Sequence, residues 1–436
     1  MNSETTIKEY DVIIAGAGIA GVLAANRLCQ TLEHANILII DKSPFPGGRI
    51  QAVNHSEQIW GGGLSYLSKQ LIEYIQHSIT LDPDSAAVPD FFKGRMNTGA
   101  ILAAGKFQEF PLSECFSTIG AKALGGKAAA QTWAQFEKIF TADANAMDKK
   151  ISRVWKDGKK SPAAAVMEHL SSLVGMVDVW QASPQSLKER IDYLHSGLYT
   201  GPWEDILDLL LQAPLNSKKL EQIYSCRIIT ASQQEDLWNL TTEKGLVKGK
   251  SLLVAQSPWH AAEWLQHADQ PTPVLQLALK SKPTSAVNLN LKLKDPCEIP
   301  DLIYVPAEGV QIIQRDEKTL CFQTFIDFEH SLDAPSVLKA IKRLKRARKK
   351  IQIANASISG EDEHLALISV AWPLSAHVNE QKLLDKLKDP QNFQSKHLSF
   401  CGDSYGGDYS PDTNLVKSLT SACTTINAQQ ATEHEG

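Results

Sequence analysis

The sequence has no long hydrophobic run, no excess of positive charge and no signal for export. Its 436 residues include 44 Lys and Arg against 49 Asp and Glu, which gives a net charge of -5. We therefore expect no general attraction to nucleic acid. No apolar run reaches the roughly 18 residues of a membrane-spanning helix, so no transmembrane segment is expected. The first ten residues, MNSETTIKEY, lack the basic start and apolar middle of a signal peptide.

Cysteine is also sparse, and the spacing of the cysteines does not match that of a metal site. The seven cysteines are scattered and form no CxxC pair. An odd, dispersed set argues against a disulfide framework and against a structural metal site, and we expect no metal. The same usage fits a reducing compartment, so the predicted location is the cytoplasm.

What the sequence does contain begins with a glycine motif near the N-terminus. The stretch YDVIIAGAGIAGVLAANRLCQ predicts a short buried strand, a turn and a helix. Gly16, Gly18 and Gly21 form the pattern GxGxxG. The first glycine permits a tight turn, the second lets the backbone approach a pyrophosphate, and the third lets the helix pack closely on the strand. Ile19 and Ala20 would begin the helix, whose free N–H groups face the phosphates.

An acidic residue stands at the end of the second predicted strand. Asp41 lies 20 residues after Gly21 (41 − 21), followed by Lys42. A carboxylate at this spacing accepts hydrogen bonds from ribose hydroxyl groups and disfavours the extra phosphate of NADP. The motif and the acid together predict a dinucleotide site.

A second glycine element follows, and it goes beyond a minimal dinucleotide fold. Gly47, Gly48 and Arg49 combine close backbone approach with a side chain that donates to phosphate. In this order, GxGxxG, an acidic strand end and GGR, the sequence resembles the flavin-containing amine oxidase superfamily, which includes monoamine and polyamine oxidases, protoporphyrinogen oxidase and phytoene desaturase. The resemblance implies that these residues bind FAD.

Three later stretches match the same superfamily. The resemblance implies that IWGGGLSYLS lies under the flavin ring, that CRIITASQ passes the adenine, and that LSFCGD leads to a glycine-acid turn before a C-terminal helix. That helix lacks the family's Gly-Ala pair. The further cofactor-binding candidates are Gly61, Gly62, Gly63, Leu64, Arg227, Ile228, Gly402, Asp403, Leu415 and Val416.

The expected fold class is α/β, with a Rossmann-like FAD-binding domain and a discontinuous α+β substrate domain that carries an antiparallel sheet. Residues 1–66, 206–282 and 391–436 are assigned to the FAD-binding domain. Residues 67–205 and 283–390 are assigned to the substrate-binding domain, with predicted strands between about 283 and 328 forming an apolar wall over the flavin.

The resemblance implies an FAD-dependent oxidoreductase of the amine oxidase type that transfers hydride from a C–N substrate to non-covalent flavin, with reoxidation by dioxygen. Two alternatives stay open: a desaturase or protoporphyrinogen-like oxidase, and a flavin-binding protein without turnover. The family's active-site lysine has no match, since its position falls near Val287 or Asn288. Aromatic candidates for the catalytic site are Tyr405, Tyr409, Trp372 and Trp60.

One further segment, LKAIKRLKRARKKIQIA, is strongly basic. Eight of the twelve residues from 339 to 350 are Lys or Arg, and Leu338, Ile341, Leu344 and Ile351 predict an apolar helical stripe. This helix is either a solvated face or a docking surface for an acidic protein or an anionic membrane.

Overall fold

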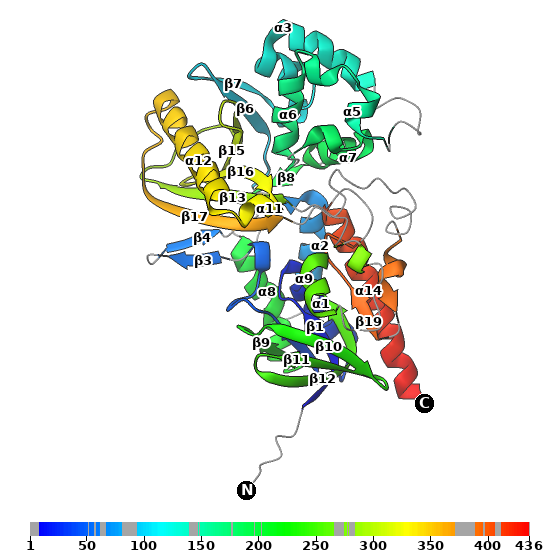
Figure 1. Ribbon diagram of the computed structural model, residues 1–436. Helices are drawn as coiled ribbons and strands as arrows, with labels where there is room; N and C mark the ends of the chain where they lie inside the picture. The colour runs from blue at the N-terminus through cyan, green and yellow to red at the C-terminus, as the bar shows by residue number, and fades with distance from the viewer. Residues whose placement is uncertain are drawn as a thin grey trace.

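The computed structural model describes most of the chain in two stacked parts (Figure 1). The described residues are 8–50, 52–55, 58–61, 67–80, 94–138, 147, 149–175, 178–195, 197–201, 203–265, 274–276, 278, 284–370, 389–395, 397–405 and 411–435. We call the part with both chain ends the lower part and the other the upper part. Among the described residues, no helix is long and apolar enough to cross a membrane.

The lower part is built on an eight-stranded sheet whose central strands are parallel. Its main path runs β10-β11-β12-β1-β2-β9. The strand β19 lies off this path and also pairs with β12. The bounds are β1 Glu9–Ala15, β2 Ile37–Ile40, β9 Leu220–Ile223, β10 Ile228–Gln234, β11 Leu237–Thr242, β12 Gly245–Val254, β18 Gln394–Ser395 and β19 Leu398–Phe400.

Both faces of this sheet are buried, as expected for parallel strands. Side chains of β1 alternate between two cores: Val12 and Ile14 face one, and Ile13 faces the other. Four helices contribute to the first core and one to the second. They are α1 (Ile19–Thr31), α2 (Lys69–Thr80), α8 (Trp203–Asn216) and α14 (Pro411–Glu435), and then α9 (Pro258–Leu265).

The upper part contains a seven-stranded sheet of order β17-β13-β16-β15-β14-β6-β7, in which only the β14–β6 pair is parallel. The bounds are β6 Thr98–Ala103, β7 Lys106–Pro111, β13 Thr284–Leu293, β14 Leu302–Val305, β15 Val310–Asp316, β16 Thr319–Asp327 and β17 Gly360–Val370. The strands predicted between 283 and 328 are therefore confirmed. The strands β6 and β7 form a hairpin at one end of the sheet.

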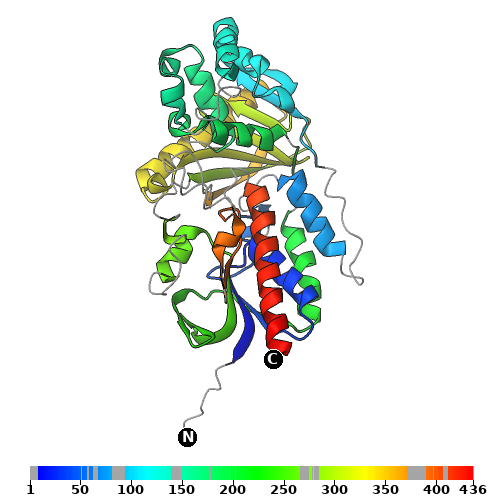
Figure 2. The ribbon, with the colours of Figure 1, turned by 90° about the vertical axis from the view of Figure 1, so that its right-hand side faces the viewer.

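Helices cover the two faces of the upper sheet differently. The basic helix α12 (Ala334–Ala354) packs on one face, and a helical group packs on the other face near β6, β7 and β14 (Figures 1 and 2). That group contains α3 (Thr118–Glu137), α5 (Ile151–Val154), α6 (Ala164–Leu173) and α7 (Pro184–His195). The α/β fold class with two unlike sheets is thus confirmed.

Short elements connect the two parts. The strands β3 (Ala52–His55) and β4 (Gln58–Gly61) form a hairpin after the second glycine element. The strand β5 (Leu67–Ser68) pairs with β8 (Leu198–Tyr199), and α11 (Phe328–Ser331) precedes α12.

Packing refines the element boundaries expected from sequence. Helix α2 lies in the lower core through Leu71, Ile72 and Ile75, although its residues follow the expected boundary at 66. Within the stretch CRIITASQ the strand begins at Ile228, and the parallel strand β9 that precedes this stretch was not predicted. Amphipathic pattern alone does not say which sheet a helix will cover.

Candidate cofactor site

The first glycine turn has the geometry that a dinucleotide loop requires. Gly16 has φ +112°, a left-handed conformation that disfavours side chains, and a Cβ on Gly21 would lie 1.9 Å from the Gly16 carbonyl oxygen. Gly18 is different, because a Cβ added there would meet nothing within 4 Å. The two outer glycines are therefore needed for folding, whereas Gly18 leaves open space beside the N-terminus of α1.

The second glycine element packs directly on the first. The Gly47 N–H donates to the Ala17 carbonyl at 2.7 Å, and Gly47 forms a parallel bridge with Gly18. Gly48 has φ +54°, and its added Cβ would approach the Gly18 Cα to 3.2 Å. Both glycine elements thus present backbone at one place, which the sequence spacing only suggested.

Asp41 stands at the end of β2, where it organises the turn. Its carboxylate accepts from the Ala17 N–H at 2.6 Å and from the Ser43 N–H at 2.7 Å. Each oxygen retains a further lone pair for a ribose hydroxyl. Lys42 is exposed beside it.

The segment before β10 runs alongside this acid. The Cys226 N–H donates to the Asp41 carbonyl at 3.0 Å. The Arg227 side chain is largely exposed and pairs with Glu263 at 3.1 Å, and the Ile228 side chain is buried in the core. The backbone N–H and carbonyl of Arg227 bond to Glu243, so Cys226 is the residue of this segment that contacts the acidic strand end.

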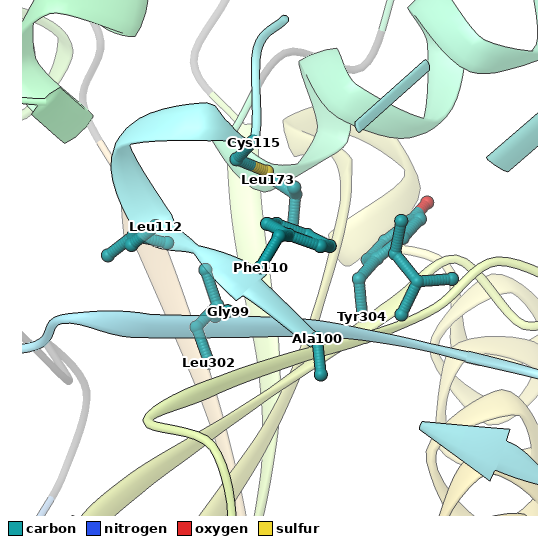
Figure 3. A pocket seen from close by; sticks show the side chains of 9 residues that line it. Gly99, Ala100, Phe110, Leu112, Cys115, Leu173, Leu302 and Tyr304 are labelled. Atoms are coloured by element: carbon teal, nitrogen blue, oxygen red, sulfur yellow. The ribbon is translucent and has the colours of Figure 1, made fainter. Parts of the chain in front are cut away.

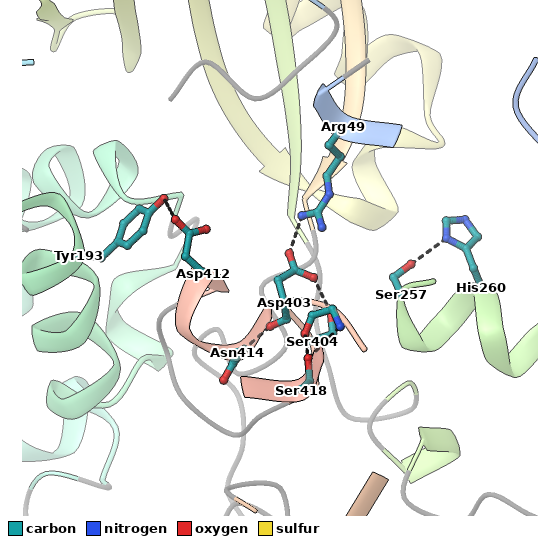
Figure 4. Close-up of polar contacts among 10 residues, drawn as sticks. Arg49, Tyr193, Ser257, His260, Asp403, Ser404, Asp412, Asn414 and Ser418 are labelled. Atoms are coloured by element: carbon teal, nitrogen blue, oxygen red, sulfur yellow. Dashed lines mark hydrogen bonds and ion pairs between the residues drawn. The ribbon is translucent and has the colours of Figure 1, made fainter. Parts of the chain in front are cut away.

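His260 was not foreseen at this end of the site. It lies on α9, and its Nδ1 is 2.8 Å from the Ser257 hydroxyl (Figure 4). Burial lowers the pKa of His260, and the nearby Lys42 charge acts in the same direction. A neutral imidazole beside Asp41 and Lys42 was not marked by any motif in the sequence.

Arg49 and Asp403 form an ion pair between the two ends of the chain. The Arg49 Nη1 lies 2.6 Å from the Asp403 Oδ2, and the Asp403 side chain is only 10% exposed (Figure 4). Burial opposes the guanidinium charge, but the Asp403 carboxylate raises the pKa of Arg49 above its ordinary value. The pair ties the second glycine element to the predicted glycine-acid turn.

The glycine-acid turn is held on the first turns of α14. Gly402 has φ +141°, its N–H donates to the Ser418 hydroxyl at 3.0 Å, and that hydroxyl donates to the Gly402 carbonyl at 3.0 Å. The Asn414 amide donates to the Asp403 carbonyl at 3.0 Å. Ser418 and Asn414, both fully buried, are site-supporting residues that the sequence did not identify.

The helix α14 directs its N-terminus toward the junction of the two parts (Figure 2). Leu415 is buried in the lower core and Val416 packs against that core, so these candidates face inward. Only backbone groups of this first turn are available to a ligand.

A second buried carboxyl, Asp412, lies in that first turn. Its Oδ2 accepts from the Ser68 N–H at 3.0 Å and from the Tyr193 hydroxyl at 3.3 Å (Figure 4). Burial raises the pKa of Asp412, and the negative charge of Asp403 raises it further. Asp412 therefore joins α14 to β5 and α7, across the two parts.

Of the aromatic candidates for the catalytic site, Tyr405 is the one whose side chain the structure describes. Tyr405 is fully buried, packs against Phe393 and Phe400, and donates its hydroxyl to the Gln256 carbonyl at 2.6 Å. This places Tyr405 in the lower core as a packing residue rather than in the expected catalytic site. Its short distance along the chain from the glycine-acid turn suggested otherwise.

The remaining expected contacts are only partly described. Trp60 and Gly61 lie in β4, with no description of their side chains. Gly62, Gly63, Leu64, Trp372 and Tyr409 lie outside the described residues.

A small apolar cavity lies in the upper part, away from the cofactor-site residues (Figure 3). Phe110, Leu112, Leu173 and Leu302 line it, together with Tyr304. The Tyr304 hydroxyl points out of the cavity to His169 Nδ1 at 3.0 Å and to the Ser172 hydroxyl at 2.9 Å. The cavity is a packing defect between sheet and helices and carries no polar group for a ligand.

In the described part of the chain, cysteines and potential metal-binding side chains form no further candidate site. All seven cysteines lie in the described part of the chain, buried and without a disulfide. Burial raises the pKa of Cys29, Cys115 and Cys423 to about 12, so these thiols stay protonated. Within the described ranges no group of three His, Cys, Asp or Glu residues could hold a metal ion.

Comparisons with known proteins agree with this geometry. Residues 14–74 match the family model of the NAD(P)-binding Rossmann-like domain. No curated protein sequence matches the chain significantly.

Several solved structures share the whole fold. A candidate protoporphyrinogen oxidase from Exiguobacterium sp. 255-15 is 13% identical with a TM-score of 0.65, covering 99% of this chain and 100% of that one. Cyclohexylamine oxidase from Brevibacterium oxydans is 15% identical with a TM-score of 0.63, covering 97% and 100%. Putrescine oxidase bound to putrescine is 11% identical with a TM-score of 0.61, covering 96% and 99%. The chain therefore has the fold of the amine oxidase and protoporphyrinogen oxidase group, which confirms the resemblance at the level of the fold.

Proposed function

We propose that this protein is an FAD-dependent oxidoreductase of the amine oxidase type, with FAD bound non-covalently. The observation that carries the proposal is the meeting of Gly18, Gly48 and the Arg49–Asp403 pair at one place. Two glycine backbones, a helix N-terminus and an arginine suit a pyrophosphate, and Asp41 suits a ribose.

The residues present fit FAD along its length. Asp41 and the nearby segment 225–228 suit the adenosine end, and Gly18 leaves the space that a phosphate would fill. The backbone N–H groups at the start of α14 would favour negative charge on a bound cofactor. When bound, the flavin supplies the redox chemistry by accepting a hydride, and the protein orients substrate and cofactor.

The substrate is proposed to lie between this site and the upper sheet. The strand β17 contacts the turn η1 (Gly48–Ile50), which contains Arg49, so the β17–β13 edge of the upper sheet adjoins the cofactor site (Figure 1). Helix α12 covers the opposite face of that sheet and stays outside.

The face of these strands that points away from α12 is not the apolar wall that the sequence suggested. Val287 and Leu289 point toward α12, so Asn288 points the other way, as side chains alternate along a strand. On that side, Gln311 donates to Gln323, and Gln323 donates to the Asn288 Oδ1 at 2.9 Å. All three amides are buried, and the Gln311 Oε1 has no partner among the described residues. Such a row supports a substrate with polar groups.

In the proposed reaction, a hydride leaves the carbon beside an amine nitrogen, which gives an imine. Dioxygen then takes up two electrons and two protons and becomes hydrogen peroxide. The second candidate is desaturation or protoporphyrinogen-like oxidation of C–C or ring C–H bonds. It is favoured by the lack of a lysine at Val287 or Asn288, since Lys292 on the same strand is exposed.

The cofactor is tested first. Purified protein should be yellow, and acid precipitation should release the colour into the supernatant. Colour retained by the pellet would contradict non-covalent binding, and bound NADP in place of flavin would contradict the site assignment.

The reaction type is tested by anaerobic reduction. Amines and, separately, polycyclic or pyrrolic compounds are added, and the visible flavin absorption is followed. Bleaching by amines and peroxide release in air are expected. Bleaching only by ring compounds supports the second candidate. A flavin that dithionite reduces but no compound of either set bleaches indicates a binding protein without turnover.

A further inference from the structure

Helix α12 presents two opposite stripes with different character. Ala340, Leu344, Ala347 and Ile351 are buried against the upper sheet. The sequence suggested that Leu338 belongs to this buried stripe, but its side chain is 56% exposed. The reason is geometric: Leu338 lies six residues before Leu344, which on an α-helix with about 3.6 residues per turn places it roughly a third of a turn away from Leu344.

The opposite side of α12 forms what we call the outward stripe. Its residues follow each other at steps of three or four and therefore share one helix face. They are Leu338, Lys342, Lys345, Lys349 and Ile353. Leu338 and Ile353, the two ends, are 56% and 82% exposed. Three lysines are thus flanked by two apolar side chains, about 22 Å apart along the helix.

Three other cations of α12 are engaged by the loop after β14. Glu308, which is buried, pairs with Arg346 at 2.7 Å and with Lys350 at 2.6 Å. Arg343 donates to the Glu308 and Gly309 carbonyls at 2.5 and 3.1 Å. These three side chains dock the helix, whereas the three lysines of the outward stripe are exposed.

Helix α12 is strongly positive, although the chain as a whole has a net negative charge. Residues 339–350 hold eight of the 44 basic residues and no acidic one. The rest of the chain therefore has 36 basic against 49 acidic residues, a net charge of -13. An anionic partner would be attracted to this helix and repelled elsewhere, which orients it.

We propose that the outward stripe of α12 binds the surface of an anionic phospholipid membrane, with the helix lying flat. Lysines reach acidic headgroups, and the exposed Leu338 and Ile353 enter the boundary with the acyl chains. An acidic protein would satisfy the lysines but gives no reason for exposed apolar residues at both ends. Leu332, just before α12, is also exposed, at 76%.

The test is sedimentation of the flavin-loaded protein with vesicles. Vesicles of phosphatidylcholine with phosphatidylserine should bind the protein, those of phosphatidylcholine alone should not, and binding should weaken with salt. The variant K342E/K345E/K349E should lower the partition coefficient by about two orders of magnitude, since each lysine near an anionic surface contributes about fivefold.

Two further variants separate the sources of binding. The matched charge reversal K122E/K127E/K156E, at exposed lysines of α3 and of the turn after α5, should bind as the parent protein does. The variant L338S/I353S should bind about tenfold more weakly and keep the salt dependence. Unchanged flavin content and melting temperature show that each variant is folded.

Absence of binding to the anionic vesicles overturns the proposal. It is also overturned if L338S/I353S binds vesicles as well as the parent protein and polyglutamate competes fully, because the stripe is then a docking surface for acidic polypeptides.

Discussion

Asp403 in the lower part and Glu308 in the upper part are buried to a similar extent, with 8% and 6% exposed. Both pair with arginine, but their surroundings differ. Asp403 lies between two glycine elements and a helix N-terminus, with a second carboxyl, Asp412, close by. Glu308 lies in a loop and pairs with two cations of one docked helix.

From this difference we infer that the first ion pair belongs to a ligand site and the second does not, because only the first has open backbone beside it. Near Asp403, Gly18 adjoins empty space. Near Glu308, the Gly309 position is filled, because a Cβ there would lie 2.2 Å from Arg343 Nη2. The first pair is suited to a cofactor, and the second fixes a helix.

The largest effect is expected for Gly18→Val. Its side chain enters space that the protein leaves empty, so the apoprotein should fold, while FAD affinity falls at least about a hundredfold, or about 3 kcal/mol. Flavin content and far-UV circular dichroism measure the two effects. The matched control Gly21→Val should fail to fold, because of its 1.9 Å contact with the Gly16 carbonyl. Normal flavin content in Gly18→Val would show that this loop does not face a phosphate.

Arg49→Met should come next. It leaves the Asp403 carboxylate without its cation, and we expect the apoprotein to lose about 2 kcal/mol of unfolding free energy, discounted for the partial exposure of Arg49. FAD affinity should fall as well. Urea unfolding with and without added FAD measures both losses. The conservative Arg49→Lys should restore part of each, and equal stability of Arg49→Met and the parent protein would contradict a stabilising pair.

Asp412→Asn tests the second carboxyl of the lower part. Because burial raises the folded-state pKa of Asp412, its stabilising contribution is complete below about pH 4 and is lost as the pH rises through that raised value. Asparagine still accepts from Ser68 and Tyr193 without a charge. We therefore expect a gain of about 1 kcal/mol at pH 7.5 and a smaller gap at pH 4.5 in urea unfolding. A stability gain of Asp412→Asn over the parent protein that grows toward acidic pH would contradict a raised pKa of Asp412.

Glu308→Gln should give the smallest change. Although burial opposes ionisation, hydrogen bonds from Lys350 and Arg346 hold the pKa of Glu308 below its ordinary value. The carboxylate therefore stabilises the fold above about pH 4.5, and the loss at neutral pH should be about 0.5–1 kcal/mol because both cations are about half exposed. Thermal unfolding measures it, with unchanged flavin content as the control. Loss of flavin would show that the Glu308 ion pairs also affect the cofactor site, and would contradict the distinction drawn between Glu308 and Asp403.

The sequence by itself determined the local elements of the cofactor site. GxGxxG, the acid at Asp41 and the Gly47–Gly48 turn work through backbone conformation and short spacing, which are written in a few consecutive residues. The strands of the upper sheet and the basic helix were predictable from side-chain periodicity for the same reason.

The tertiary structure alone decided which distant residues meet. It paired Arg49 with Asp403, placed Asn414 and Ser418 beneath the glycine-acid turn, and moved Tyr405 from the expected active site into the core. It also turned Leu338 outward and the amides of Gln311 and Gln323 inward. Such contacts depend on how helices and sheets pack, and packing is set by the shape of the whole core rather than by any short stretch of sequence.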